Sequence, residues 1–445
     1  MRELKTTTSR CPECLTPVPA VVYEDDRGRV LMRKSCDIHG ESTAVIAPDG
    51  RWYHHAVGRR ETGCGSGCGC GGEPATGDPF EKLSTCVALI EIVDSCNLEC
   101  PTCFASSPRS DEVDCRPFEE IVARIGGVVA RKGFIDILQL SGGEPTLHPR
   151  FFDILSWCLA NDRIGYVLIN TNAVRIATDE PFRRRLASLR TANSFELYVQ
   201  FDGVQEAGQR ALRAADLREI RRRAIDEVGA LGVPSTLAMV VTAETIDHLG
   251  DALRFGLGRR HCRGITFQPM FASGRTSGTL AAGTLHTADM IDAVTSQSEG
   301  LITEDDFTPL PCGDPNCHTI GYVVRGPDGP AGLGSLIDLG SLQSFLSDRV
   351  NYSLEDLVRC GCETEPLGEI LKSFELSPDA PFRIFVKPFM DRFNFDQDRI
   401  DRCCTHVVRR DGSLDSFCRY YLHGGALSEV DVVPRGSVTI EGRAR

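Results

Sequence analysis

Three cysteines lie within eight positions of the stretch SCNLECPTCFA, residues 95–105. Cys96, Cys100 and Cys103 follow the spacing C-x3-C-x2-C, with no fourth cysteine alongside them. A closed zinc site or a closed iron–sulfur site takes four protein ligands. A 4Fe-4S cluster held by three thiolates leaves one iron open, and an open coordination position is typical of a catalytic metal centre. The spacing therefore predicts a catalytic cluster.

The N-terminal segment carries a second metal-ligand pattern, CPEC at 11–14 and CDIHG at 36–40. Between them, residues 21–32 predict a hairpin that turns at Asp26-Arg27-Gly28. Two such knuckles on a small β unit are typical of a site for one metal, zinc or a single iron. We expect this site to be structural rather than an electron carrier. Its ligands would be Cys11, Cys14, Cys36 and His39.

Residues 62–79 are rich in glycine, which would suit a flexible linker. A linker has no use for cysteines, however, and glycine lets the backbone wrap closely around a cluster. The segment therefore predicts an auxiliary iron–sulfur site, with the ligands Cys64, Cys68, Cys70 and Cys86.

The last third of the chain contains more cysteines, in the stretches 310–319 and 402–418. They predict a second auxiliary cluster, whose expected ligands are Cys312, Cys317, Cys403 and Cys418. Cys404 could replace one of these four. Cys360 and Cys362 have no evident partner. We expect the isolated residues Cys115, Cys158 and Cys262 to be buried apolar thiols.

The composition excludes several classes of protein. The 445 residues include 49 Lys and Arg and 62 Asp and Glu, and the net charge of −13 argues against a nucleic-acid binder. The arginine runs 183–185 and 221–223 are expected on solvated helix faces. No signal peptide and no apolar run long enough to cross a membrane is visible, so we expect a cytoplasmic protein with reduced thiols.

Strand and helix patterns alternate between residues 87 and 270. Helical periodicity is found at 118–133, 151–162 and 217–232. Such alternation predicts parallel strands with right-handed crossovers, and six repeats suit a partial barrel whose chemistry lies at the carboxyl ends of the strands. The expected strands are 87–93, 134–141, 166–171, 195–202, 235–241 and 264–270.

Residues that could do chemistry follow five of the six expected strands: the cysteine loop follows the first, and polar residues follow the second, third, fourth and sixth. A ligand rich in hydroxyls and charge suits hydrogen-bonding side chains at these positions. S-adenosylmethionine (SAM) is such a ligand, because its amino and carboxylate groups can chelate the open iron. One electron from the reduced cluster would then break a carbon–sulfur bond and release a 5′-deoxyadenosyl radical. The strand-end residues are Ser141, Gly142, Gly143, Glu144, Asn170, Asn172, Gln200, Asp202 and Gln268.

Residues 87–275 resemble the radical SAM superfamily, in which C-x3-C-x2-C is followed by an aromatic residue, here Phe104, and a GGEP run follows the second strand. The resemblance implies a partial (β/α)6 barrel with Cys96, Cys100 and Cys103 as catalytic cluster ligands. It also implies roles in binding SAM. Gly142, Gly143 and Glu144 would face the methionine amino group. Asn170, Asn172, Gln200 and Asp202 would meet the ribose or the methionine carboxylate, and Gln268 would approach the adenine.

Nearly the whole layout is similar to one subgroup, which contains class D radical SAM methyltransferases and archaeal tetraether lipid synthases. The former act on pterins with a folate-type methyl donor, and the latter join lipid tails through carbon. The chain departs from this subgroup after Cys70, where GGEPATGDP replaces the usual histidines. That departure leaves the ligation of the first auxiliary cluster open.

The predicted protein is an α/β enzyme in four parts: a rubredoxin-like or zinc-ribbon-like knuckle (1–57), a Gly/Cys-rich cluster segment (58–86), the barrel (87–275) and a C-terminal auxiliary-cluster and substrate domain (276–445). We expect it to form a carbon–carbon bond at an unactivated carbon of a small molecule or a lipid, by methylation or chain coupling. If the substrate is a lipid, the enzyme would work at the membrane surface.

The expected cofactors are SAM, the radical-generating 4Fe-4S cluster, one or two auxiliary 4Fe-4S clusters, and one zinc or mononuclear iron. A ferredoxin or flavodoxin would supply electrons. The alternatives are an iron–sulfur electron-transfer or sensing protein without SAM cleavage, and a peptide-modifying maturase. A long apolar tunnel facing Cys103 would favour a lipid substrate, and a short polar pocket would favour a pterin.

Overall fold

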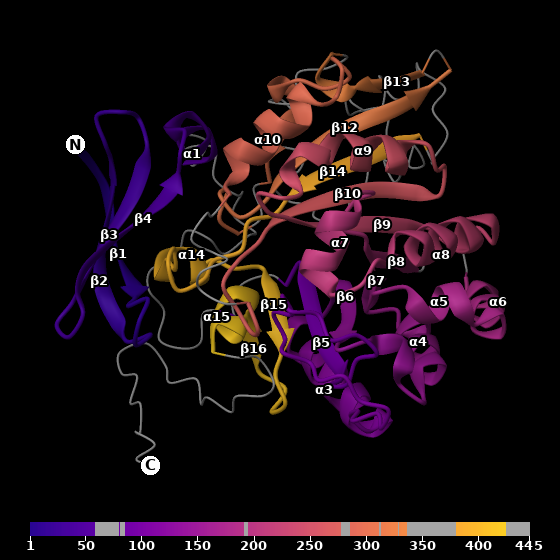
Figure 1. The fold of residues 1–445 in the computed structure, drawn as a ribbon. Helices are drawn as coiled ribbons and strands as arrows, with labels where there is room; N and C mark the ends of the chain where they lie inside the picture. Colours follow the sequence, from indigo (N-terminus) through magenta and orange to yellow (C-terminus); the bar gives the residue numbers. More distant parts are fainter. Residues whose placement is uncertain are drawn as a thin grey trace.

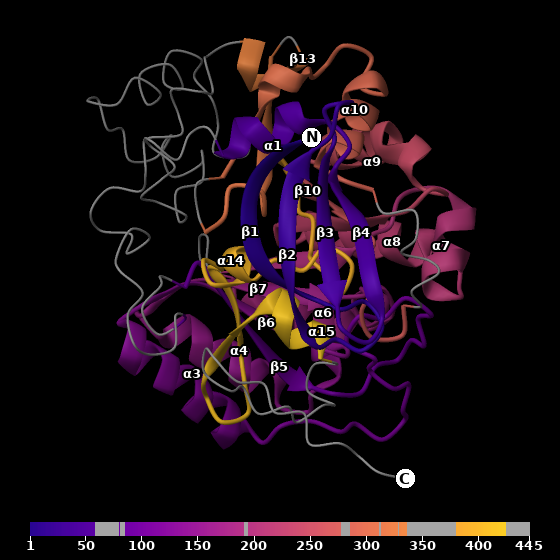
Figure 2. The same ribbon diagram turned by 90° about the vertical axis from the view of Figure 1, so that its left-hand side faces the viewer.

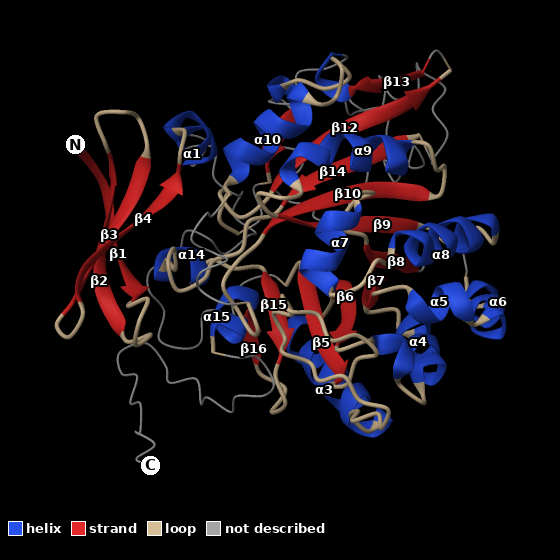
Figure 3. Cartoon of the chain, viewed as in Figure 1, coloured by secondary structure: helices blue, strands red, loops and turns tan. Residues whose placement is uncertain are grey.

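The computed structural model describes residues 1–57, 80, 85–190, 195–276, 285–310, 313–327, 329–335 and 380–423. These residues form a four-stranded sheet and a 12-stranded sheet. In Figure 1 the small sheet stands on one side of the large one, and helices α3, α4, α5, α6 and α8 lie on the side away from it. Figure 2 shows the small sheet in front of the large one, and Figure 3 shows the distribution of helix and strand.

The N-terminal segment forms the small antiparallel sheet. β2 and β3 form the expected hairpin, whose turn is held by the Asp25 carboxylate, which accepts from the backbone N–H groups of Arg27 and Arg29. Val22, Val30 and Met32 are buried among the residues that face one side of this sheet. The elements are β1 (Arg2–Arg10), β2 (Pro17–Glu24), β3 (Val30–Cys36), β4 (Gly40–Ala47) and α1 (Gly50–Val57).

The six expected strands are present and run parallel, so the prediction of a partial barrel is confirmed. Residues 88–93 are all buried, as expected where helices and loops cover both faces of a parallel sheet. Ile121, Ile125 and Val128 recur at helical spacing and bury one face of α3 in the main core. The strands are β5 (Val87–Val93), β6 (Ile135–Gly142), β7 (Ile164–Thr171), β8 (Phe195–Gln200), β9 (Ser235–Val241) and β10 (Cys262–Pro269).

Helices connect these strands, and the three predicted ones are present within one to two residues of their expected ends. The structure adds shorter helices between them. The set is α3 (Phe118–Lys132), α4 (Phe151–Ala160), α5 (Val174–Thr178), α6 (Glu180–Ser188), α7 (Glu206–Arg213), α8 (Arg218–Ala230), α9 (Leu249–Leu257) and α10 (Thr287–Ser296). No helix among the described residues is both long and apolar enough to cross a membrane.

The large sheet continues beyond the expected barrel boundary at residue 275. β14 (Pro381–Val386) pairs in parallel with β10, and β15 (Thr405–Val408) pairs in parallel with β5. The C-terminal region thus adds a parallel strand to each edge of the six-stranded unit. The remaining elements are β11 (Phe307–Pro309), β12 (Thr319–Gly326), β13 (Gly329–Gly332), β16 (Leu414–Ser416), α14 (Gln397–Ile400) and α15 (Phe417–Leu422), and Figure 1 shows α14 and α15 between the two sheets.

Candidate active site

The cysteine loop leaves the carboxyl end of β5 and brings three half-buried thiols together. Burial raises the pKa of Cys96 to about 12, and the charges of Glu144, Cys100 and Cys103 act in the same direction. The thiols are therefore close enough to influence one another. A metal that binds them must displace their protons, as thiolate ligation requires.

Arg275 holds this loop from the far end of the barrel sequence. Its side chain donates from Nε to the carbonyl of Cys100 at 2.9 Å and from Nη1 to that of Ser107 at 2.8 Å. Its backbone N–H donates to the carbonyl of Cys103 at 3.0 Å. Arg275 could not be predicted from the sequence, because a single arginine in a loop carries no spacing signal.

Gly142 and Gly143 let the end of β6 approach the beginning of the cysteine loop. A Cβ atom at Gly142 would meet the carbonyl oxygen of Val93, and one at Gly143 would meet that of Ser95. Both contacts would be shorter than 3.0 Å, a distance below which Cβ contacts are essentially never found. Gly142 also has φ +118°, which favours glycine. The glycine pair therefore positions the cysteine loop through close backbone contact.

The carboxylate of Glu144 accepts four hydrogen bonds from the protein. Thr146 donates from its backbone N–H at 3.2 Å and from Oγ1 at 2.7 Å, Thr171 Oγ1 donates at 2.9 Å, and the backbone of Asn172 donates at 2.7 Å. Burial raises the pKa of Glu144, and these donors oppose the effect. Glu144 thus joins the ends of β6 and β7, while Asn172 Nδ2 donates to Asn97 Oδ1 beside Cys96 at 2.7 Å.

A cavity of about 570 Å³ fills the inside of the sheet, and the cysteine loop borders it. The cavity is lined both by polar groups at the strand ends and by aromatic side chains such as Tyr198 and Phe385. The structure therefore brings most of the predicted cofactor-binding residues to one cavity: Ser141, Gly142, Gly143, Asn170, Asn172, Gln200 and Gln268. Gln268 Nε2 donates to Tyr198 Oη at 2.8 Å, and Asn170 Nδ2 donates to Ser141 Oγ at 3.0 Å.

Glu144 and Asp202 are not among the residues that line this cavity, and their expected contacts with SAM stay predictions. The fully buried carboxylate of Asp202 binds Arg213 through both oxygens, at 2.6 and 2.9 Å, and lies 3.0 Å from Arg221. Burial would raise the pKa of Asp202, but the two guanidinium groups lower it to about 2. Gln200 Nε2 donates to Asp202 at 2.7 Å. Asp202 therefore lies behind the wall and positions the residues that form it.

Arg213 and Arg221 do line the cavity. Burial lowers the pKa of Arg213, but Asp202 and, to a smaller extent, Cys100 raise it above its usual value. Burial lowers the pKa of Arg221 to about 10, so its guanidinium remains charged at neutral pH. Two guanidinium groups and one carboxylate leave a net positive charge beside the cysteine loop.

The arginine runs 183–185 and 221–223 were expected on solvated helix faces. This prediction was wrong for Arg183 and Arg221, which are buried.

The C-terminal cysteines lie around Lys387, which lines the same cavity. Burial lowers the pKa of Lys387. The opposing effect, which raises this pKa, comes from the charges of Cys317, Cys403, Cys404 and Cys418. Burial raises the pKa of Cys418 to about 12. The structure thus brings together three of the four predicted ligands, Cys317, Cys403 and Cys418, with the substitute Cys404. The fourth, Cys312, lies outside the described residues. Cys404 and Lys387 also line the cavity.

Cys86 lies beside this C-terminal group. Its backbone N–H donates to the carbonyl of Cys404 at 3.0 Å, and its side chain is buried and disulfide-bonded. Its predicted metal site stays a prediction, because Cys64, Cys68 and Cys70 lie outside the described residues, as do Cys360 and Cys362. Of the isolated cysteines, Cys158 and Cys262 are buried as expected, and Cys115 is half-buried.

The N-terminal knuckle forms a compact ligand set. One ligand atom from each of Cys11, Cys14, Cys36 and His39 can be chosen so that all lie within 4.8 Å of one another. Cys11 and Cys36 are buried, which suits a closed structural site.

Residues 90–256 match the sequence model of the Radical SAM superfamily, and residues 3–48 match that of the HMPTM N-terminal zinc ribbon domain. The chain is 27% identical over 504 residues to 7,8-dihydro-6-hydroxymethylpterin dimethyltransferase of Methanocaldococcus jannaschii. This alignment covers 97% of this chain and 96% of the relative. The chain is also 27% identical over 232 residues to mycofactocin maturase MftC of Mycobacterium tuberculosis, covering 49% of this chain and 54% of that protein.

Among solved structures, SuiB of Streptococcus suis bound to the precursor peptide SuiA superimposes with a TM-score of 0.40 at 12% identity, over 65% of this chain and 68% of the other. AdoMet-bound anSMEcpe gives a TM-score of 0.38 at 20% identity, over 47% of this chain and 58% of the other. By the sequence matches, residues 90–256 form a radical SAM superfamily domain, and residues 3–48 before it match a zinc ribbon domain.

Proposed function

We propose that this chain methylates a carbon atom of a pterin-type heterocycle by radical SAM chemistry. The observation that carries the proposal is one cavity whose lining includes Cys96, Cys100 and Cys103 as well as Cys404 and Lys387. A substrate in this cavity would lie between a radical-generating site and a second metal-ligand group. The similarity over nearly the whole length of a pterin dimethyltransferase supports the choice of substrate.

The residues around the cysteine loop fit a 4Fe-4S cluster and SAM. When bound, these groups supply a 5′-deoxyadenosyl radical. Three thiols face a cavity that still has room for a ligand, so one cluster position would stay open to SAM. Arg213 and Arg221 supply positive charge for the thiolate-bound cluster and for a carboxylate. Asn170, Gln200 and Gln268 present amide groups to the amino acid, ribose and adenine of SAM.

A cavity of this size suits a compact heterocycle bound beside SAM. Its volume of about 570 Å³ would be shared by SAM and substrate, and pockets for small molecules fall roughly between 300 and 1,000 Å³. Gln139, Tyr166, Tyr198 and His318 supply hydrogen-bonding groups along its wall. Flat aromatic rings with adjacent polar groups suit a pterin, whereas an extended lipid tail would need a longer apolar channel.

The test is an anaerobic reaction of the reconstituted protein with SAM, a low-potential donor such as reduced flavodoxin, 7,8-dihydro-6-hydroxymethylpterin and a folate-type methyl donor. We expect 5′-deoxyadenosine together with a methylated pterin, both measured by mass spectrometry, and neither from a Cys103→Ala variant. Absence of 5′-deoxyadenosine would support the alternative of an electron-transfer or sensing protein. Abundant 5′-deoxyadenosine without a methylated pterin would contradict the substrate, and would make long-chain lipids and peptides the next substrates to test.

A further inference from the structure

The zinc ribbon docks on the segment 391–399, which precedes the C-terminal cysteines in the chain. Ser9 Oγ donates to the carbonyl of Phe395 at 2.5 Å, and Lys34 Nζ donates to that of Arg392 at 2.8 Å. Ser9 and Lys34 are both buried. Figures 1 and 2 show the small sheet beside α14 and α15. The contact is therefore a packed interface within the molecule.

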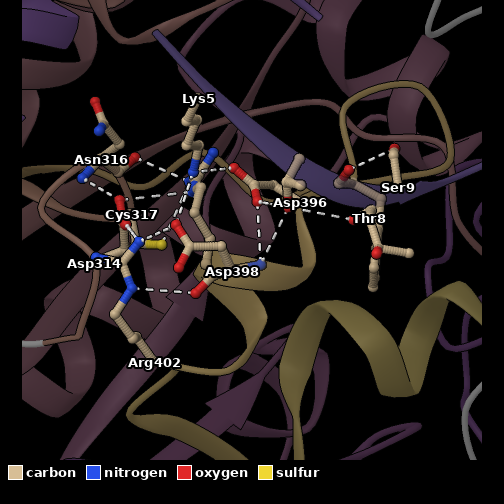
Figure 4. A network of polar contacts seen from close by, with 12 residues as sticks. Lys5, Thr8, Ser9, Asp314, Asn316, Cys317, Asp396, Asp398 and Arg402 are labelled. Carbon is tan, nitrogen blue, oxygen red and sulfur yellow. Dashed lines mark hydrogen bonds and ion pairs between the residues drawn. The ribbon is translucent and has the colours of Figure 1, made fainter. Parts of the chain in front are cut away.

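Lys5 of β1 places its ammonium group between two aspartates of that segment (Figure 4). Its Nζ lies 2.6 Å from Asp396 Oδ2 and 2.9 Å from Asp398 Oδ2. Thr7 Oγ1 donates to Asp396 at 2.8 Å, and the Asp396 side chain is only 4% exposed. Removal of the ammonium would leave a nearly buried carboxylate without its counter-ion.

Asp398 continues this network towards Cys317 (Figure 4). Arg402 Nη2 lies 2.7 Å from Asp398 Oδ2 and 2.6 Å from Asp314 Oδ2. Asp314 is buried, and its backbone carbonyl accepts from the N–H of Cys317 at 2.9 Å. Its carboxylate accepts from the N–H of Asn316 at 2.9 Å. Asp314 therefore shapes the turn that carries Cys317, and Arg402 holds that turn against α14.

Arg399 makes a second connection from the same segment. Its Nη2 donates to Cys317 Sγ at 3.3 Å and to the carbonyl of Asn316 at 3.1 Å. The short helix that binds Lys5 at one end thus contacts the Cys317 sulfur directly. Lys5, Arg399 and Arg402 face the carboxylates of Asp314, Asp396 and Asp398, so the loss of one cation unbalances the whole network.

We propose that the N-terminal zinc ribbon positions the C-terminal cysteine group, with Lys5 as the positioning residue. The inference rests on the proposed function only in treating Cys317 as part of a metal site. A metal held by Cys11, Cys14, Cys36 and His39 would order the small sheet, and this sheet presents Lys5 to the segment that holds the Cys317 turn. The folding of one metal site would thereby set the geometry of the second.

The test compares Lys5 variants of the full-length protein by hydrogen–deuterium exchange. Lys5→Met removes the ammonium and keeps an unbranched apolar side chain. We expect exchange in residues 313–318 and 397–404 to become faster by about tenfold or more. Exchange in residues 3–48 and the metal bound by the ribbon should stay at wild-type levels. Lys5→Arg should restore most of the protection, because it returns a cation that can reach both aspartates.

Arg2→Met is the matched control. Arg2 lies in the same strand, is 66% exposed and pairs with Glu24 of the ribbon itself, so both segments should exchange as in the wild type. Wild-type exchange of residues 313–318 in Lys5→Met would overturn the inference, and so would equal acceleration in Arg2→Met. The measurement needs neither SAM nor substrate. Failure to find a methylated pterin would therefore contradict the proposed function and leave this inference standing.

Discussion

Asp202 and Asp216 both pair with arginine, but the two ion pairs differ in their exposure to water. The pKa of each carboxyl is lowered to about 2 by arginine partners, two in the case of Asp202 and chiefly Arg218 in that of Asp216. Asp202 is fully buried, whereas Asp216 pairs with Arg218 near the surface, where water and salt screen the charges. Only the buried carboxylate supports residues of the active-site wall.

Replacement of Asp202 by asparagine should destabilise the protein strongly. The change leaves Arg213 and Arg221 buried without their counter-ion, which costs about 3–5 kcal/mol in comparable buried pairs. Asp216→Asn makes the same chemical change near the surface and should cost less than about 1 kcal/mol. Urea unfolding at neutral pH measures both free energies. Equal small losses would contradict the placement of Asp202 at the centre of a buried network.

The same pair predicts an acid dependence. The pKa of Asp202 is about 2 in the folded chain and about 3.9 when unfolded, so between these values the unfolded state binds more protons. The contribution to stability is therefore complete above about pH 4 and is lost as the pH falls towards 2. Unfolding measured at several pH values should show Asp202→Asn losing less stability than the wild type over this window.

Gly143→Ala should disturb the cysteine loop. The new Cβ would collide with the carbonyl of Ser95, which is backbone and has little room to move. We expect reduced iron binding at Cys96, Cys100 and Cys103, measured as iron per chain. The control is Gly126→Ala in α3, where nothing lies within 4 Å of the new Cβ. That change should leave iron binding intact and stabilise the helix by about 0.5–1 kcal/mol.

Spacing in the sequence was enough to predict that Gly142 and Gly143 approach the loop of Cys96, Cys100 and Cys103, but not where every polar side chain points. Gln200 and Asp202 are two residues apart and would share a face in a continuing strand. β8 ends at Gln200, however, and Asp202 has φ +56°, which directs its side chain behind the wall. The burial of Arg221 could have been predicted, since three consecutive helical residues span about 200° and rarely all face water.

At the scale of elements, β14 and β15 were missed because each pairs with a strand far away in the sequence. β15 has four residues, too few for a clear pattern. The aromatic-rich stretch 382–395 contributes to both the core and the cavity, because the side chains of β14 alternate between the two. Phe382, Ile384 and Val386 are buried in the core, while Phe385 and Lys387 line the cavity.

Loss of the ribbon metal should lower the stability of the protein without abolishing SAM cleavage. Cys14→Ala removes one of four ligands, so the chain should lose its N-terminal metal and part of its stability, as structural sites contribute to folding. SAM cleavage per folded molecule should survive, because the ribbon supplies no residue to the cysteine loop. Metal analysis and 5′-deoxyadenosine measurements check this prediction. A well-folded variant without SAM cleavage would instead assign the ribbon an electron-transfer role.

At the scale of the whole molecule, an aromatic cluster connects the two cysteine groups. Phe104 follows Cys103 and lies 5.7 Å, centroid to centroid, from Phe417, which precedes Cys418. Tyr421 lies 4.7 Å from each of these rings. Cys103 and Cys418 both pack against this cluster. The radical-generating loop and the C-terminal group are therefore close neighbours across the cavity, although more than 300 positions separate them in the sequence.

This arrangement predicts that the C-terminal group acts after hydrogen abstraction. A carbon radical formed in the cavity must gain or lose an electron, or be held, before a stable product forms, and a metal site beside Lys387 is well placed for that step. Cys317→Ala combined with Cys418→Ala should leave 5′-deoxyadenosine formation largely intact and abolish methylated product. Cys158→Ala, a buried thiol in α4 outside both groups, is the control and should keep the wild-type ratio. Both products should be quantified in the same reaction, because the ratio separates lost coupling from lost protein. If the folded double variant makes product at the wild-type ratio, the C-terminal cysteines have only a structural role.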